Sequence, residues 1–118
     1  ALKPLPIPPP ADAPKDPEEA RYQRLANALI KVHEKECKDR MSNPDFGGCS
    51  YKIEYLCVPT AKQKNGAWYI VASWQMLEKK PGGDKYYQTF QSGDETNPQW
   101  IPVSAVKTLA ARAGIKWE

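Results

Sequence analysis

Apolar and polar residues recur along the chain with two different periods, and these periods predict its secondary structure. From residue 17 onward, apolar side chains such as Leu25, Leu29 and Cys37 recur every three or four positions. This spacing places them on one face of a helix of about 20 residues. Asp16 can accept hydrogen bonds from the first turn, and Pro17 suits the first helical position. We therefore predict a helix that begins at residue 17 and ends at the SNPDFGG segment.

Strict alternation then predicts β-strands. In CSYKIEYLC, residues 49–57, every second residue is apolar, which is typical of a half-buried strand. A second alternating run covers about residues 67–77, and a third covers residues 85–91. The Asn65-Gly66 dipeptide separates the first two runs and favours a tight hairpin. These patterns predict an antiparallel meander of three strands.

The last part of the chain predicts a second helix. Ser104 is a candidate N-cap, apolar residues follow at helical spacing, and Gly114 marks the end. The WIPV segment before it is either a short strand or a bridging segment. The expected fold class is α+β with the order α-β-β-β-α, an N-terminal helix packed on a three- to four-stranded antiparallel sheet.

Composition divides the chain into two parts. Residues 1–16 are rich in proline and have no periodic apolar face, so we expect a disordered or polyproline II leash. Three interpretations of this segment stay open: a spacer, a ligand for an aromatic groove on a partner protein, or an inert N-terminus. Residues 17–118 are expected to form a single α+β domain. Because the chain begins at Ala1 without a methionine, we expect that an upstream segment was removed; it is a signal peptide, a membrane anchor or simply another part of a longer chain, and the cysteines favour the first two.

The three cysteines favour one disulfide. Eight residues of straight strand separate Cys49 from Cys57 by roughly 26 Å, too far for a bond that needs about 4.4–6.8 Å between Cα atoms. Cys37 can reach either of them, and we favour Cys37–Cys49 because its loop is shorter. A disulfide and the proline-rich leash together favour an oxidising compartment, so we expect a periplasmic or secreted protein. Three reduced thiols in a cytosolic protein remain the alternative.

No catalytic or cofactor motif is recognisable. His33, Cys37 and Met41 lie on one helix face and could contact a soft metal, but two strong ligands do not complete a site. Cys37 also lies near the C-terminal end of its helix, where the helix dipole opposes a thiolate. We therefore predict no enzyme, no metal site and no cofactor.

The aromatic residues suggest a binding surface. The chain has four Trp and six Tyr, and several fall on the predicted strands. We expect some of them to lie on the sheet face away from the first helix, bordered by lysines, as in a protein interface. The candidate interface residues are Tyr69, Val71, Tyr86, Tyr87, Lys79, Lys80 and Lys85.

Taken together, these patterns favour a non-enzymatic protein-binding module of the bacterial envelope or secreted space. It would be an immunity protein, an inhibitor or an accessory part of an envelope machine, docking through the sheet face or the polar loop at 92–99. The alternative is a small basic nucleic-acid-binding protein, although a net charge of +3 makes nucleic acid unlikely. A homodimer could also cover the face, and contact with a membrane would occur only through the removed upstream segment.

Overall fold

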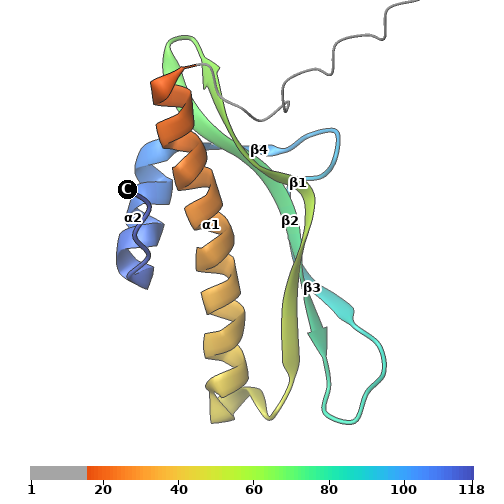
Figure 1. Ribbon diagram of the computed structural model, residues 1–118. Helices are drawn as coiled ribbons and strands as arrows, with labels where there is room; N and C mark the ends of the chain where they lie inside the picture. Colours follow the sequence, from red (N-terminus) through yellow and green to blue (C-terminus); the bar gives the residue numbers. More distant parts are fainter. Residues whose placement is uncertain (1–15) are drawn as a thin grey trace, which may run out of the picture.

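The structure, a computed structural model, describes residues 16–118. The predicted leash lies outside the described residues, apart from Asp16. The described part forms a long helix, a four-stranded antiparallel sheet and a short second helix (Figure 1). The predicted α+β fold is therefore confirmed. Within residues 16–118, neither helix combines the length and the apolar character that crossing a membrane requires.

The first helix begins and ends where the sequence predicts, and its 26 residues exceed the expected length of about 20. Helix α1 spans Pro17–Ser42. The Asp16 carboxylate accepts a 2.9 Å hydrogen bond from the Glu18 backbone N–H, which satisfies one of the free donors of the first turn. At its other end, Asn43 starts a short 3-10 helix, η1, at Pro44–Phe46. Gly47 then takes a left-handed φ of 60°, and the chain turns back toward the sheet.

Strand β2 is the centre of the sheet. β1 (Ser50–Lys64) pairs along one whole side of β2 (Ala67–Lys79). The other side of β2 is shared by β3 (Tyr87–Ser92), which pairs with its C-terminal half, and β4 (Gln99–Pro102), which pairs with its N-terminal half. Asn65 and Gly66 form the predicted hairpin turn, with φ values of 52° and 79°. The WIPV segment therefore contributes to a fourth strand.

Helix α2, Val103–Ala113, follows β4 without a loop. Because no loop intervenes, Pro102 occupies the N-cap position, and Ser104 lies inside the helix. The predicted cap at Ser104 is therefore wrong. The end of the helix is as predicted, because Gly114 adopts a left-handed φ of 68° and its N–H contacts the carbonyls of the last turn.

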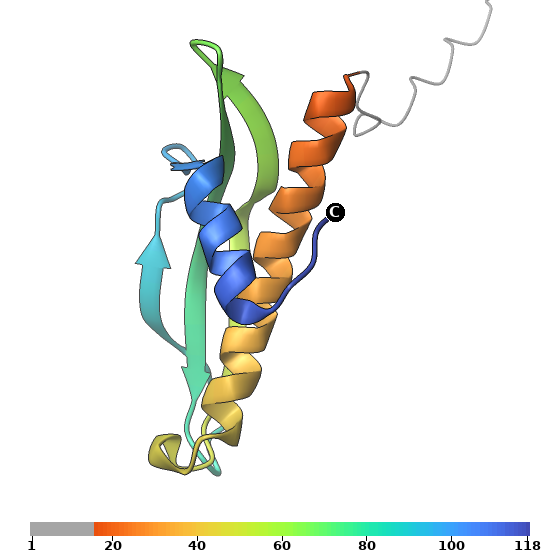
Figure 2. The same ribbon diagram turned by 90° about the vertical axis from the view of Figure 1, so that its left-hand side faces the viewer.

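The two helices cover the same face of the sheet, which we call the inner face; the opposite face is the outer face (Figures 1 and 2). Helix α1 runs along β1, whereas α2 covers β4 and the neighbouring half of β2. Eleven helical residues span only about 16 Å, and the 13 residues of β2 span about 43 Å. Helix α2 is therefore too short to cover the inner face of β2 from end to end.

The core accordingly has two parts, named by their positions in Figure 1. The upper cluster lies where both helices meet the sheet, and its fully buried members include Leu29, Ile70 and Val106. Trp117 packs against it from the chain end. The lower cluster lies between the C-terminal half of α1 and the sheet, and consists of Cys37, Tyr51 and Met76 with Phe46, Cys49 and Ile53 packed against it.

Irregular pairing changes which face some residues occupy. The β1–β2 register shifts between Tyr55 and Cys57 and again between Cys57 and Thr60. Residues directly opposite each other in a sheet share a face, so Cys57 follows its partner Ser73 to the outer face. The predicted alternation placed Cys57 on the same face as Tyr55, and this was wrong because an inserted residue reverses the alternation.

Candidate protein-binding site

The structure does not gather the predicted interface residues into one patch. Tyr69 and Val71 lie at the start of β2, whereas Lys79 and Lys80 lie at and just beyond its end. Ten residues of strand separate Tyr69 from Lys79 by about 33 Å. The predicted set therefore falls into two groups at opposite ends of the sheet.

In the first group, strand β4 covers part of the surface. Trp100 lies opposite Val71 on the outer face, and its ring forms an edge contact with Tyr69 at a centroid distance of 5.8 Å. Val71 is only 4% exposed as a result, so it contributes little to any docking surface. Trp100 itself is 40% exposed. Lys64 places its ammonium 5.3 Å from the Trp100 ring centroid, within the range of a cation–π contact.

In the second group, Tyr86 is held between lysines on the outer face. The ammonium groups of Lys52 and Lys79 lie 4.3 Å and 5.3 Å from its ring centroid. Lys80 pairs with Glu78 at 3.4 Å, and Lys85 is exposed. This group resembles the predicted aromatic patch with a lysine border, but it lacks aliphatic neighbours at its surface.

Tyr87 lies on the inner face, not on the outer face as predicted. It pairs with Glu78, which shares its face with Met76 of the lower cluster. The register shift within the β2–β3 pairing places Phe90 opposite Met76, so Phe90 also lies on the inner face. Tyr87 is 60% exposed and Phe90 is 55% exposed. Together they form an uncovered aromatic pair on the side of the sheet that carries the helices.

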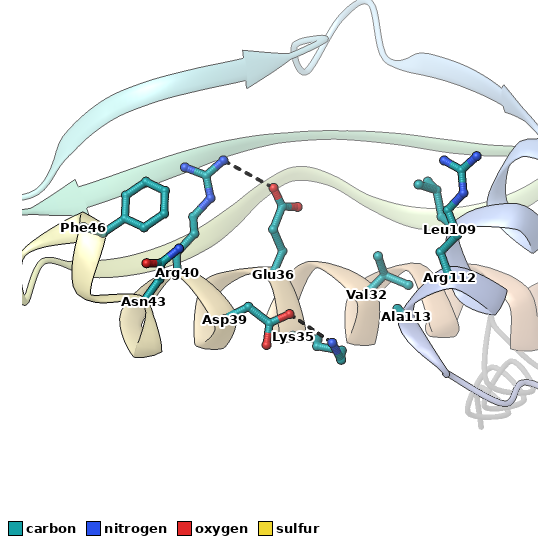
Figure 3. A pocket seen from close by; sticks show the side chains of 10 residues that line it. All are labelled: Val32, Lys35, Glu36, Asp39, Arg40, Asn43, Phe46, Leu109, Arg112 and Ala113. Atoms are coloured by element: carbon teal, nitrogen blue, oxygen red, sulfur yellow. Dashed lines mark hydrogen bonds and ion pairs between the residues drawn. The ribbon is translucent and has the colours of Figure 1, made fainter.

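On the same side of the sheet, a groove opens between α1 and the end of α2 (Figure 3). Its volume is about 390 Å³. Val32, Phe46 and Leu109 supply its apolar wall, and the side chains of Glu36 and Arg40 point from α1 into the same space. We call this cavity, together with Tyr87 and Phe90, the inner groove. It exists because α2 ends above the lower half of the sheet.

The charges along the inner groove are mostly paired. Glu36 and Arg40 approach to 3.5 Å, and Lys35 donates to Asp39 at 2.9 Å, both across one helical turn. The Arg40 guanidinium also lies 5.4 Å from the Phe46 ring centroid. Arg112 makes no ion pair within residues 16–118. The groove therefore offers an apolar wall with one uncompensated cation at its rim.

His33 is a core residue. Its Nδ1 lies 2.7 Å from the Tyr55 hydroxyl, and its ring makes a tilted contact with Trp74 at a centroid distance of 4.5 Å. Burial lowers the pKa of His33 to about 4, so the imidazole is neutral at pH 7. A cavity of about 300 Å³ lies beside it, lined also by Cys37 and Met41. Among residues 16–118, no three His, Cys, Asp or Glu side chains are placed to hold a metal ion.

The three cysteines are free thiols in the structure. Cys37 and Cys49 belong to the same lower cluster, whereas Cys57 lies on the outer face, with its sulfur 3.6 Å from the Glu95 carbonyl oxygen. Burial raises the pKa of the Cys37 thiol, which disfavours a thiolate nucleophile. Cys49, the partner that we favour for Cys37, therefore lies in the same cluster as Cys37. The disulfide between them stays a prediction.

The polar loop between β3 and β4 is held by hydrogen bonds of its own. One oxygen of Asp94 accepts hydrogen bonds from the backbone N–H groups of Thr96 and Asn97 and from the Thr96 hydroxyl. These bonds, the one from the Thr96 side chain foremost, hold the pKa of Asp94 below its usual value. The Asp94 carboxylate is thus used to fix the loop.

Comparisons with protein-family models, with curated proteins and with solved structures found no match for this chain. The residues that sequence reasoning missed are Phe46, Phe90 and Leu109. Phe90 was detectable as an aromatic residue in an uncharged strand, but its face depends on a bulge. Leu109 belongs to the periodic apolar stripe of α2, and its 38% exposure follows from where that helix ends.

Proposed function

We propose that this protein is a non-enzymatic protein-binding module that docks through the inner groove. The observation that carries the proposal is the exposed aromatic pair, Tyr87 and Phe90, on the face of the sheet that carries α1 and α2, the two helices that line the cavity. Aromatic anchors in or near a pocket supply much of the energy of protein interfaces. Arg112 at the rim adds a site for a carboxylate, so the partner carries an apolar side chain next to an acidic residue.

We further propose that the module works in the bacterial cell envelope or secreted space, as an immunity protein, an inhibitor or an accessory part of an envelope machine. The position of Cys37 and Cys49 in one cluster is compatible with a disulfide, and disulfides persist in oxidising compartments. Binding would act by steric occlusion or scaffolding. The proposal needs no catalytic residue.

The test is a selection of binding peptides from a display library against the full chain, followed by calorimetric titration. Phe90→Ser and Leu109→Ser should each weaken binding of the selected peptides at least about tenfold, because each removes an apolar anchor. Val58→Ser is the matched control, since Val58 is 62% exposed and lies on β1 outside the inner groove. Equal loss in all three variants, or no loss in the first two, would refute docking at this groove.

A second candidate function is supported by the outer face. Four lysines of β1 and β2 point outward with one carboxylate, Glu54, among them; they are Lys52, Lys62, Lys64 and Lys79. Tyr86 and Trp100 lie on the same face, and such rings can stack on single-stranded bases. Fluorescence anisotropy with a labelled single-stranded oligonucleotide tests this. If the outer face binds nucleic acid, the affinity should fall as the salt concentration rises, and it should also be lower in a Lys52→Ala/Lys79→Ala variant.

A further inference from the structure

Strand β3 has a free edge. It pairs with β2 on one side, and no helix or strand of residues 16–118 lies beyond its other side (Figure 2). The edge of a sheet presents unpaired N–H and C=O groups that can bind another strand. Natural proteins usually protect such edges with charged residues, with proline or with bulges.

The two edges of this sheet differ in that protection. β1, at the opposite edge, carries Lys52, Glu54 and Pro59 and has two register shifts. β3 has one register shift, and its sequence YQTFQS contains neither a charged residue nor a proline. The β1 edge is therefore protected against pairing with a strand of another chain, and the β3 edge is much less protected.

We propose that β3 pairs antiparallel with β3 of a second copy of this chain across a two-fold axis. In one register, Gln88 of each copy lies opposite Gln91 of the other. Both side chains lie on the outer face, and each amide can donate and accept, so the pairs bond without an unmatched charge. Lys85 and Asp94 each lie two residues beyond an end of β3, so this register brings opposite charges near both ends of the paired segment.

This pairing would extend the sheet from four strands to eight. It would bring the Tyr87 and Phe90 side chains of both copies together on the inner face, so that the two inner grooves form one surface. A six-residue strand pair is a small contact, and small interfaces are weak. We expect a dissociation constant between about 10 µM and 1 mM. Self-pairing uses the backbone edge of β3, whereas the proposed partner binding uses side chains of the inner groove. An experiment can therefore exclude one interaction without excluding the other.

Sedimentation velocity of the full chain from about 5 µM to 1 mM tests the proposal. The wild-type chain should shift from monomer to dimer. Q88K/Q91K and Q88E/Q91E should each stay monomeric, because like charges face each other across the axis. An equimolar mixture of the two variants should form dimers again, since opposite charges now meet. Gln63→Lys, an exposed Gln-to-Lys change on the β1 edge, should dimerise like the wild type.

Three results would overturn the proposal. A wild-type chain that is monomeric throughout the range excludes self-pairing, and a strand from a different protein then becomes the candidate occupant of the edge. Unchanged dimers in Q88K/Q91K place the contact elsewhere on the molecule. A mixture that stays monomeric, with circular dichroism showing both variants folded, excludes the Gln88–Gln91 register.

Discussion

The upper and lower halves of the inner face share one sheet but are built differently. In the upper half, both helices pack on the sheet, and Ile70 and Val106 are fully buried. In the lower half, α1 alone covers the strands, and Phe90 and Tyr87 remain exposed. The cause is the length of α2, which reaches over β4 but not over β3. The comparison shows how a short second helix lets one half of a small domain stabilise the fold and leaves the other half free for contact.

The largest expected effect comes from the upper half. Ile70→Ala should lower the free energy of unfolding by about 4 kcal/mol, because it leaves a cavity between both helices and the sheet. Ile70→Val should cost only about 1 kcal/mol. Urea denaturation followed by tryptophan fluorescence measures both. If Ile70→Ala lowers the free energy of unfolding less than Phe90→Ala does, the lower half contributes more to stability than the upper half, which would contradict this account.

Acid should weaken the contact where α1 crosses β1 and β2. The pKa of His33 is about 4 when folded and near 6.5 when unfolded, so protonation favours the unfolded chain. This contribution is complete above pH 6.5 and should fall by about 3 kcal/mol as the pH drops to 4. Denaturation at stepped pH measures it, and His33→Leu should flatten the slope in that window. If the free energy of unfolding of the variant falls equally steeply with pH, the pH dependence comes from carboxylates and not from His33.

Oxidation should strengthen the lower half if Cys37 and Cys49 form a disulfide. The closed loop is short, and the chain-entropy model gives about 3 kcal/mol of stabilisation. Reductant should then lower the denaturation midpoint of the wild type and of Cys57→Ser equally. Non-reducing peptide mapping after alkylation identifies the pair. Three alkylated thiols in protein purified without reductant would contradict both the disulfide and the case for an oxidising compartment.

The turn between β3 and β4 joins the two halves at the sheet edge, and Gly93 is its least replaceable residue. Its φ is 71°, and an added Cβ would meet the Ser73 Cβ at 3.0 Å and the Gln99 N at 3.1 Å. Gly93→Ala should cost more than about 2 kcal/mol, since steric overlap adds to the left-handed backbone cost. Gly82→Ala is the matched control. Its φ is 74° with open space around it, so it should cost about 1 kcal/mol.

Exposed residues of the lower half should hardly affect stability. Tyr87→Ser/Phe90→Ser should change the free energy of unfolding by less than about 1 kcal/mol, because both side chains are more than half exposed. The same variant should lose binding to peptides selected on the wild-type chain. Thermal denaturation and calorimetric titration of the same sample separate the two effects. A large loss of stability would show that the pair belongs to the core.

The fold followed from patterns that are local in sequence. The α1 stripe, the alternation in β2 and in β1 as far as Tyr55, and the Asn65-Gly66 turn each depend on neighbouring residues, and each was predicted correctly. The candidate binding site could not be predicted from such local patterns, because it depends on the register of the β2–β3 pairing. Simple alternation in β3 puts Tyr87 and Phe90 on opposite faces, and the bulge near Thr89 puts them on the same face. The outward position of Cys57 has the same cause.

The groove itself depends on a tertiary distance that no local pattern contains. The apolar stripe of α2 predicts a buried face, but not that the helix ends above the lower half of the sheet. Leu109 and Phe46 therefore appear as ordinary core candidates in the sequence. Their role as groove walls follows only from the packing of α1 beside α2.

The central claim is that partners dock in the inner groove. The most direct test is a two-dimensional ¹H–¹⁵N NMR titration of the full chain with a peptide selected for binding. The account predicts that shifted amides cluster in β3, in the C-terminal half of α1 and at the end of α2. Shifts that cluster instead around Lys52, Tyr86 and Trp100 on the outer face would contradict it.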